Sequence, residues 1–249
     1  MKNFLLNRAF VYVVLLVLMG CEGNKPGTDN LIAVDVTANY PKKNLTLQDF
    51  MDVEYIPLET TDEFISKGKV ADVGKNILIL TNMRQGEILI FDRSTGNGLK
   101  KINRRGQGPE EYILPFNVHL NKEENEIFVN DGPSSKIQVY DLEGNYKKTI
   151  FYKKGALVTN LYDYDDLHFL SQNVYAPEND SSTSTFFLLS KEDGSWMDIE
   201  VPYEKRISPV IMKRVADRVY ASVPGNSFIS FYQRNWILSE PSADTIYAH

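Results

Sequence analysis

The stretch EILIFDRSTGNGLKKI, residues 87–102, is an apolar strand, a glycine-containing turn and a second strand, which is the pattern of a β-hairpin. The same pattern occurs in KIQVYDLEGNYKKTI, residues 136–150, and in TFFLLSKEDGSWMDI, residues 185–199. The residue that ends the first strand recurs at a constant interval of 49 residues, at Asp92, Asp141 and Ser190. Equal spacing over two successive intervals indicates a structural repeat.

Two further short strands precede each hairpin. The strand directly before it is NILIL, EIFV, LHFL or RVYA in the four successive units, and another strand comes before that one. Each unit therefore has four antiparallel strands in about 40–50 residues, which is the size of a propeller blade. The units begin near Val70, Phe116, Val158 and Val210.

The fold class that this repeat predicts is an all-β propeller of four-stranded antiparallel blades. A four-stranded sheet cannot bury both of its faces alone, but blades stacked around an axis bury them against each other. A β-sandwich is the alternative, although sandwiches seldom keep a constant spacing. The only helical turn that we expect lies in NLTLQDFMDV, residues 44–53.

The N-terminus has the pattern of an export signal. Lys2 and Arg8 accompany an apolar run at residues 9–20 that is shorter than the roughly 20 residues needed to span a bilayer. The run ends in Leu-Met-Gly-Cys, which resembles a bacterial lipobox, and an ordinary secretory signal or a short anchor is the alternative. We expect a lipoprotein signal peptide at residues 1–20, a tether at 21–30 that starts at a lipidated Cys21, and a propeller domain at 31–249.

Composition limits the partners. Cys21 is the only cysteine, so the fold has no disulfide and no thiol for chemistry. Removal of Lys2 and Arg8 with the signal takes the formal net charge from −6 to −8. An acidic body argues against nucleic acid and against electrostatic adhesion to anionic lipid, so the membrane would be held through lipid on Cys21. We expect a monomer without cofactor or metal in the cell envelope, as an outer-membrane lipoprotein that is periplasmic or surface-exposed.

Several stretches in order resemble one family. VEYIPLETTDE, IFDRSTG, INRRGQGPEEY and EIFVNDGPSSKIQVYDLEG are similar to the six-bladed β-propeller lipoproteins of Bacteroidota, relatives of NHL-repeat propellers. The most specific element is the Gln-Gly-Pro-x-Glu-Tyr corner at residues 107–112, where this chain departs from the family by Glu110, and it departs again at Asn103. The family usually has glycine at both positions.

The resemblance implies a propeller of which this chain holds about four to five blades, because six would need roughly 300 residues. We expect a truncated copy whose strand at DTIY, residues 244–247, has no partner after it. The alternative is a smaller ring that the N-terminal strand LIAVDV, residues 31–36, completes.

The loop RRGQGPEEY, residues 104–112, joins the outermost strand of one blade to the innermost strand of the next. In a propeller this connection lies on the same face as the loops between second and third strands, which are NMRQG, NDGPSS, QNVYAPENDSSTS and PGNS. We expect eight side chains from these loops on one rim: Arg84, Arg104, Arg105, Gln107, Glu111, Tyr112, Asp131 and Tyr175. All but Tyr175 are the candidate ligand-binding residues, since loops on a rigid scaffold are the usual place for binding groups.

The same loop does not have the pattern of a phosphate cradle. No Gly-Lys-Ser/Thr and no helix follows it, and Pro109 removes a backbone donor. A structural corner is favoured, in which Gly106 and Gly108 permit the reversal, Glu111 caps backbone amides and Tyr112 packs between blades. Arg104 and Arg105 remain available for a ligand in either case.

Other candidates for chemistry are weaker. YDYDD, residues 162–166, lacks the ligand spacing of a calcium loop, and we expect a solvated turn on the opposite rim. His119 and His168 lie in strands without a spaced partner and His249 is terminal, so no zinc site is expected. Trp196 and Trp236 are expected to pack in the core, and Trp236, if exposed, would suit stacking on a sugar.

Two functions remain open. The first is a binding or interaction module that presents its rim of loops to a glycan, a peptide or a partner protein. The second is a propeller enzyme, such as a metal-dependent lactonase or a lyase, with a site at the mouth of the central channel. Its plausible residues are Asp72, Asn117 and Asn160 on the innermost strands, which do not recur at one register.

Overall fold

The structure of the protein is a computed structural model that divides into two units, Met1–Val53 and Glu54–His249. It describes residues 35, 37–67, 69–121, 125–156, 158, 160–173, 184–203, 207, 211–222 and 227–249. The predicted signal peptide, Cys21, the tether, the LIAVDV strand apart from Asp35, and Tyr175 lie outside these residues. No helix in the described ranges is long and apolar enough to cross a membrane.

In the first unit the described part contains one 3-10 helix, η1, at Leu47–Asp49. Thr46 is the N-cap residue of η1, and the Asp49 carboxylate accepts its amide hydrogen at 2.7 Å. This is the helical turn that the sequence predicts.

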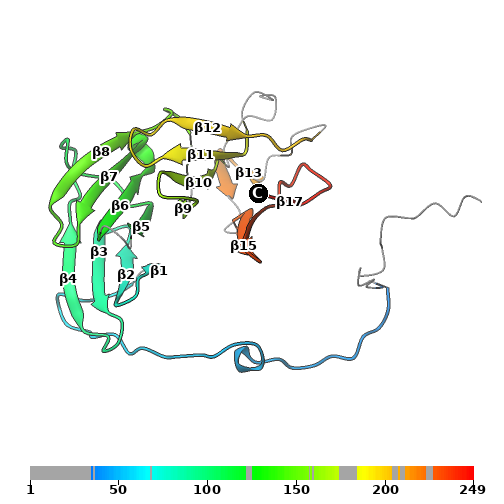
Figure 1. The fold of residues 1–249 in the computed structure, drawn as a ribbon, viewed down its shortest axis with the longest axis horizontal. Coiled ribbons are helices and arrows are strands. Elements are labelled where there is room, and N and C mark those ends of the chain that lie inside the picture. The colour runs from blue at the N-terminus through cyan, green and yellow to red at the C-terminus, as the bar shows by residue number, and fades with distance from the viewer. Residues whose placement is uncertain are drawn as a thin grey trace, which may run out of the picture. The chain divides into compact units, whose positions relative to one another are not determined.

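The second unit is an all-β propeller of four-stranded antiparallel blades, as predicted, and Figure 1 shows its sheets in chain order. The first blade is β1 (Lys69–Val73), β2 (Ile77–Asn82), β3 (Glu87–Asp92) and β4 (Gly98–Asn103). The second blade is β5 (Asn117–Asn121), β6 (Glu126–Asp131), β7 (Lys136–Asp141) and β8 (Tyr146–Phe151), with the 3-10 helix η2 (Gly132–Ser134) after β6. The third blade is β9 (Tyr162–Asp163), β10 (His168–Gln172), β11 (Phe186–Ser190) and β12 (Trp196–Ile199).

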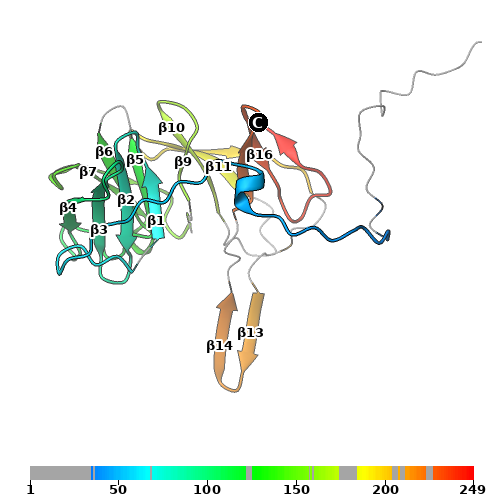
Figure 2. The same ribbon diagram turned by 90° about the horizontal axis from the view of Figure 1, so that it is seen from below.

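Two smaller sheets follow the third blade. They are the hairpin β13 (Ile211–Val215) with β14 (Arg218–Ser222), drawn in Figure 2, and the sheet β15 (Ile229–Tyr232), β16 (Asn235–Leu238) and β17 (Tyr247–Ala248). The fourth predicted unit is thus divided, because β14 and β15 belong to different sheets. Of the strand predicted at DTIY, only the last residue, Tyr247, is in a strand; it begins β17, which pairs with β16 before it through Leu238 and Tyr247.

The constant spacing of the three anchors has a local cause. Asp92 Oδ1 accepts the amide hydrogens of Ser94 and Thr95 at 2.9 and 2.8 Å, and so organises the β3–β4 turn. Asp141 and Ser190 play the same part in the next two hairpins, through bonds to Asn145 and to Glu192 and Asp193. A short oxygen-bearing side chain at the end of the third strand is therefore what each hairpin needs.

Neighbouring blades bury each other's apolar faces. Because side chains alternate along a strand, Ile79 of β2 packs against the second blade while Leu78 and Leu80 pack with Phe64 on the other face. In β6 the opposite faces are used in turn: Ile127 and Val129 face the first blade, and Phe128 faces the third. Every sheet face among these three blades is therefore covered by another element.

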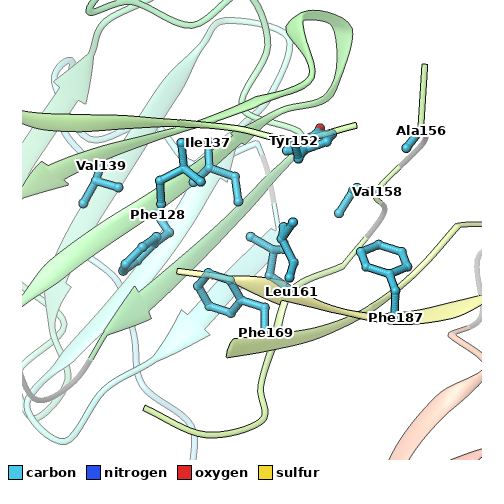
Figure 3. Packing of buried hydrophobic residues seen from close by; sticks show 11 residues of the cluster. Phe128, Ile137, Val139, Tyr152, Ala156, Val158, Leu161, Phe169 and Phe187 are labelled. Atoms are coloured by element: carbon cyan, nitrogen blue, oxygen red, sulfur yellow. The ribbon is translucent and has the colours of Figure 1, made fainter. Parts of the chain in front are cut away.

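The cluster between the second and third blades shows the packing in detail (Figure 3). Phe128 meets Phe169 edge to face with ring centroids 5.1 Å apart, and Ile137, Val158 and Phe187 complete the cluster. The far face of the third blade packs against the β15–β17 sheet, through Leu170 with Ile229 and Leu238 as neighbours in one cluster.

The turn of one blade also contacts the outer strand of the previous blade. At Gly194, where φ is +73°, an added Cβ would overlap the carbonyl group of Phe151. Gly155 has a similar φ of +84°, but no atom lies within 4 Å of an added Cβ. A substitution at Gly155 would therefore meet only the strain of a left-handed backbone, whereas one at Gly194 would meet that strain and a clash with the previous blade.

We predict that Gly194→Ala lowers the free energy of unfolding by about 3–4 kcal/mol, of which about 1–2 kcal/mol is backbone strain and the rest overpacking. Gly155→Ala should cost about 1–2 kcal/mol, from backbone strain alone. Urea denaturation of the two variants beside the wild type measures both values. Equal losses would contradict the proposed contact between the β11–β12 turn and the second blade.

Candidate functional site

The loop at residues 104–112 is closed by hydrogen bonds within the protein. The Tyr112 side chain is fully buried, and its hydroxyl accepts the Arg104 amide hydrogen at 3.1 Å and donates to the Gly86 carbonyl at 2.8 Å. Glu111 accepts the Gly108 amide hydrogen at 2.7 Å. Burial raises the pKa of Tyr112 to about 12, so the hydroxyl keeps its proton. The predicted capping by Glu111 and packing of Tyr112 are confirmed.

This corner also joins two blades. The carbonyl groups of Pro109, Glu110 and Glu111 accept hydrogen bonds from side chains of β7, which are Lys136, Gln138 and Tyr140. An added Cβ at Gly106 would overlap the Glu111 carboxylate, so a larger residue there would displace this side chain from its bond to the Gly108 amide. Neither Glu110 nor Asn103 is among the residues with positive φ, so the departure from glycine at these positions brings no left-handed strain.

The predicted rim residues fall into two groups. Arg104 donates two hydrogen bonds to the Gly144 carbonyl, and the buried Asp131 carboxylate accepts the amide hydrogens of Ile113 and Leu114 at 3.1 and 3.2 Å. Together with Glu111 and Tyr112, these two side chains therefore serve the fold. Arg84, Arg105 and Gln107 form the other group; all three are exposed, and so is Arg104. Arg105 donates to the Arg84 carbonyl at 2.8 Å, which brings the 82–86 loop and the 104–112 loop together.

A cavity of about 380 Å³ lies at the innermost strands of all three blades, and we call it the channel-mouth cavity. Its polar and aromatic lining comprises Lys69, Asp72, Thr81, Phe116, Asn117, His119, Asn160, Tyr162, Asp163 and Trp236. Lys69 is the first residue of β1 and Asn117 the first of β5, which is the end of these strands where the 82–86 loop and the 104–112 connection lie. The cavity is therefore at the rim end of the inner strands.

One layer of this lining comes from equivalent positions of the three inner strands. Asp72 pairs with Ile79, His119 with Phe128 and Tyr162 with Leu170. The repeat anchors Asp92, Asp141 and Ser190 pair with Ile77, Glu126 and His168 on the second strand of each blade. Ile79, Phe128 and Leu170 each lie two residues after these, so they occupy the same position in the three blades. The channel layer is thus Asp72, His119 and Tyr162.

His119 connects three blades. Its Nδ1 lies 3.1 Å from Asp72 Oδ2 on β1, and its Nε2 lies 2.9 Å from Asp163 Oδ2 on β9. Asp163 also pairs with Lys191 at 2.9 Å, and Asp72 accepts the Leu120 amide hydrogen at 2.9 Å. An imidazole can donate to two carboxylates at once only when it is protonated. We call Asp72, His119, Asp163 and Lys191 the inter-blade clamp.

A family comparison covers nearly the whole chain. The profile of the family described as Domain of unknown function (DUF4934) matches residues 31–249. The chain belongs to the DUF4934 family. No curated protein matches it.

One solved structure shares the fold of this DUF4934 chain, and a second aligns less well. A Bacteroides fragilis protein described as exported aligns with a TM-score of 0.59 and 16% identity, over 83% of this chain and 55% of its own. A DUF4221 family member from Bacteroides vulgatus aligns with a TM-score of 0.47 and 14% identity, over 78% of this chain and 60% of its own. This chain thus spans less than two thirds of both proteins.

The clamp shifts the pKa values of its members. Burial alone would lower the pKa of His119. The hydrogen bonds that the imidazole donates to Asp163 and Asp72 outweigh burial and raise this pKa above 6.5. Burial raises the pKa of Asp163, yet the bonds to His119 and Lys191 outweigh burial and lower this pKa to about 2. The pKa of Asp72 is lowered as well, against burial, by its bonds to His119 and to the Leu120 amide. The clamp is therefore an imidazolium between two carboxylates in mildly acidic solution.

His119 has no partner spaced along its own strand, as the sequence indicates, but the structure gives it two carboxylate partners from the neighbouring blades. The turn predicted at residues 162–166 is wrong for Tyr162 and Asp163, which form β9, and the exposed Asp163 belongs to the clamp. Asp165 does shape the β9–β10 turn, since it accepts the amide hydrogens of Leu167 and His168. Among the described residues no group of three or more His, Cys, Asp or Glu has a metal-binding arrangement.

The three polar residues of the enzyme hypothesis, Asp72, Asn117 and Asn160, line the same cavity. Asp72 belongs to the channel layer, whereas Asn117 lies two residues before His119 on β5 and so nearer the rim. Of the two tryptophans, Trp196 stacks on Phe187 with ring centroids 3.4 Å apart, as a packed outer-strand residue. Trp236 packs, as predicted, against the cluster that contains Leu170 and Ile229, and it also lines the cavity.

We predict that His119→Gln lowers the free energy of unfolding by about 1–3 kcal/mol at pH 5–6, because two carboxylates lose a charged donor. The pKa of His119 is raised in the folded state, so its contribution is complete below pH 6.5 and is lost as the pH rises through the folded pKa. The difference between wild type and variant should therefore shrink from pH 6 to pH 9. Urea titrations at both pH values measure it, and a difference that is independent of pH would refute the charged clamp.

Proposed function

We propose that this protein is a lipid-anchored binding module of the cell envelope, which holds its ligand in the channel-mouth cavity beneath the rim loops. The observation that carries the proposal is the cavity itself. Three blades and β16 supply its lining, and polar side chains converge there with the aromatic rings of Phe116, Tyr162 and Trp236. Cavities of about 300–1,000 Å³ that combine apolar walls with a few placed polar groups are the usual small-ligand sites of proteins.

The exposed rim side chains supply the outer part of the proposed site. Arg84, Arg105 and Gln107 are exposed on loops at the same end of the inner strands, and Arg105 fixes the approach of its loop to the 82–86 loop. Arg104, Glu111, Tyr112 and Asp131 then act as supports, which hold the loops in place through backbone bonds. Binding groups on loops over a rigid scaffold are a common arrangement.

A propeller enzyme with a lactonase- or lyase-like site is the second candidate. The observation in its favour is that Asp72, Asn117 and Asn160 line one cavity. The carboxylate of Asp72 is already occupied, because it accepts hydrogen bonds from the Val73 and Leu120 amides and pairs with His119. This arrangement suits a structural anion better than a free catalytic base, so binding is the preferred function.

We predict that ligands of at least one class, among glycans, peptides and amino acids, raise the melting temperature of the full mature chain. Asn117→Ala/Asn160→Ala should abolish the rise, because both side chains line the cavity. Lys75→Ala/Asp166→Ala is the matched control, since these exposed residues lie in the β1–β2 and β9–β10 turns at the opposite end of the inner strands. A screen without any stabilising compound would reject the binding function, and a melting temperature that EDTA lowers would favour the metal enzyme.

The location is part of the proposal. It is supported by the lipobox-like Leu-Met-Gly-Cys at residues 18–21 and by the fold shared with a Bacteroides fragilis protein described as exported. Export with a diacyl lipid on Cys21 would hold the chain on a membrane through its acyl chains, since two chains are needed for stable anchoring.

We predict that the wild-type chain, expressed in a bacterial host, incorporates radiolabelled palmitate and enters the detergent phase on Triton X-114 partition. Cys21→Ser should abolish both, because the sulfur is the attachment site. Ser94→Ala, in an exposed turn of the first blade, is the control for handling losses. Label on the Cys21→Ser chain would disprove the anchor.

A further inference from the structure

The wall of the channel-mouth cavity contains an aromatic pair. Trp236 of β16 and Tyr162 of β9 both line the cavity, with ring centroids 5.7 Å apart and planes inclined at 56°. Phe231 also packs against the indole of Trp236, with ring centroids 4.9 Å apart. Trp236 is only partly buried, so part of its ring is accessible. A fixed, partly exposed indole is a suitable platform for a ligand with an apolar face.

The polar lining has spare hydrogen-bonding capacity. Asn117 Oδ1 is buried without a hydrogen-bond partner, although Asn117 itself lines the cavity. A buried acceptor without a partner is unusual in proteins and destabilises the fold. A hydroxyl group of a ligand that reaches this amide would recover that loss. Asn160 adds a second amide, with one acceptor and two donor hydrogens.

The charges of the lining are balanced. Asp72 and Asp163 are the two carboxylates, and His119 and Lys191 pair with them from the protein. A cationic ligand would have to compete with those internal partners, and an anionic ligand would meet two carboxylates. Lys69 is exposed at the start of β1, where water screens its charge. The cavity therefore favours a ligand without net charge.

We infer that the channel-mouth cavity binds a short neutral glycan, with a sugar ring on Trp236 and its hydroxyl groups on Asn117 and Asn160. A pyranose has the required features, because its axial C–H groups form an apolar face while its hydroxyl groups both donate and accept. A peptide would offer backbone amides but no rigid apolar face of this kind. This inference rests on the proposed binding function and specifies its ligand class.

The test uses the two tryptophans of the chain. In a Trp196→Phe variant Trp236 is the only indole, and phenylalanine preserves an aromatic ring next to Phe187. The probes are glucose, N-acetylglucosamine, maltose and N,N′-diacetylchitobiose, with glucosamine and glucuronic acid as charged counterparts of the same ring. We expect a saturable change of Trp236 fluorescence with at least one neutral probe, and an affinity at least about tenfold weaker for the charged probes.

Two cavity variants localise the site. Asn117→Ala should weaken binding of the neutral probe by about tenfold, and Trp236→Leu should abolish it, both measured by ligand-observed saturation-transfer NMR. Far-UV circular dichroism checks that Trp236→Leu is folded, and Asn117→Ala keeps the test decisive if it is not. Lys75→Ala, at the opposite end of the inner strands, should bind like the wild type.

The outcomes distinguish the two proposals. Binding of a peptide or of a charged sugar that depends on Asn117 would overturn the neutral glycan and leave the binding function standing. Glycan binding that neither Asn117→Ala nor Trp236→Leu weakens would overturn the assignment to this cavity. Failure of every compound class to bind would overturn both.

Discussion

The second unit depends on one constraint: a four-stranded sheet of this composition has two apolar faces and cannot cover either by itself. The first blade meets the second through Ile79, Ile127 and Val129, and the second meets the third through Phe128 and Phe169. The remaining faces are closed by the segment that contains Phe64 and by the β15–β17 sheet. The stability of each blade is therefore a property of its contacts with its neighbours.

Polar contacts reinforce this stacking at two radii. Toward the outside, carbonyl groups of the 104–112 corner accept hydrogen bonds from side chains of β7, and Tyr112 is buried between the first two blades. Toward the centre, His119 holds carboxylates from β1 and β9 at once. The side chains first considered as ligand contacts, above all Arg104 and Asp131, are used for this reinforcement. The exposed rim side chains Arg84, Arg105 and Gln107 and the space between the inner strands remain for a ligand.

That space has a consistent chemistry. The clamp neutralises its own carboxylates, so the cavity next to it presents amides and aromatic rings rather than an uncompensated charge. Trp236 comes from β16, outside the three complete blades, and reaches the cavity because its sheet covers the far face of the third blade. The same packing that closes that face thus completes the proposed binding site. Fold and proposed function follow from one arrangement.

The sequence by itself determined the repeat, the order of strands, and the corner at residues 104–112. These features depend on short-range chemistry: alternation of apolar residues, an Asp or Ser that organises a turn, and glycines next to a carboxylate. Only the tertiary structure decided which inner-strand residues meet. A bulge between Val70 and Asp72 shifts the register of β1. Asp72 therefore faces His119, which lies 47 positions later in the chain, and not the residue 49 positions later that the interval between the anchors would give. Contacts between blades depend on such register shifts and on how closely the sheets stack, and neither is visible in the pattern of a single strand.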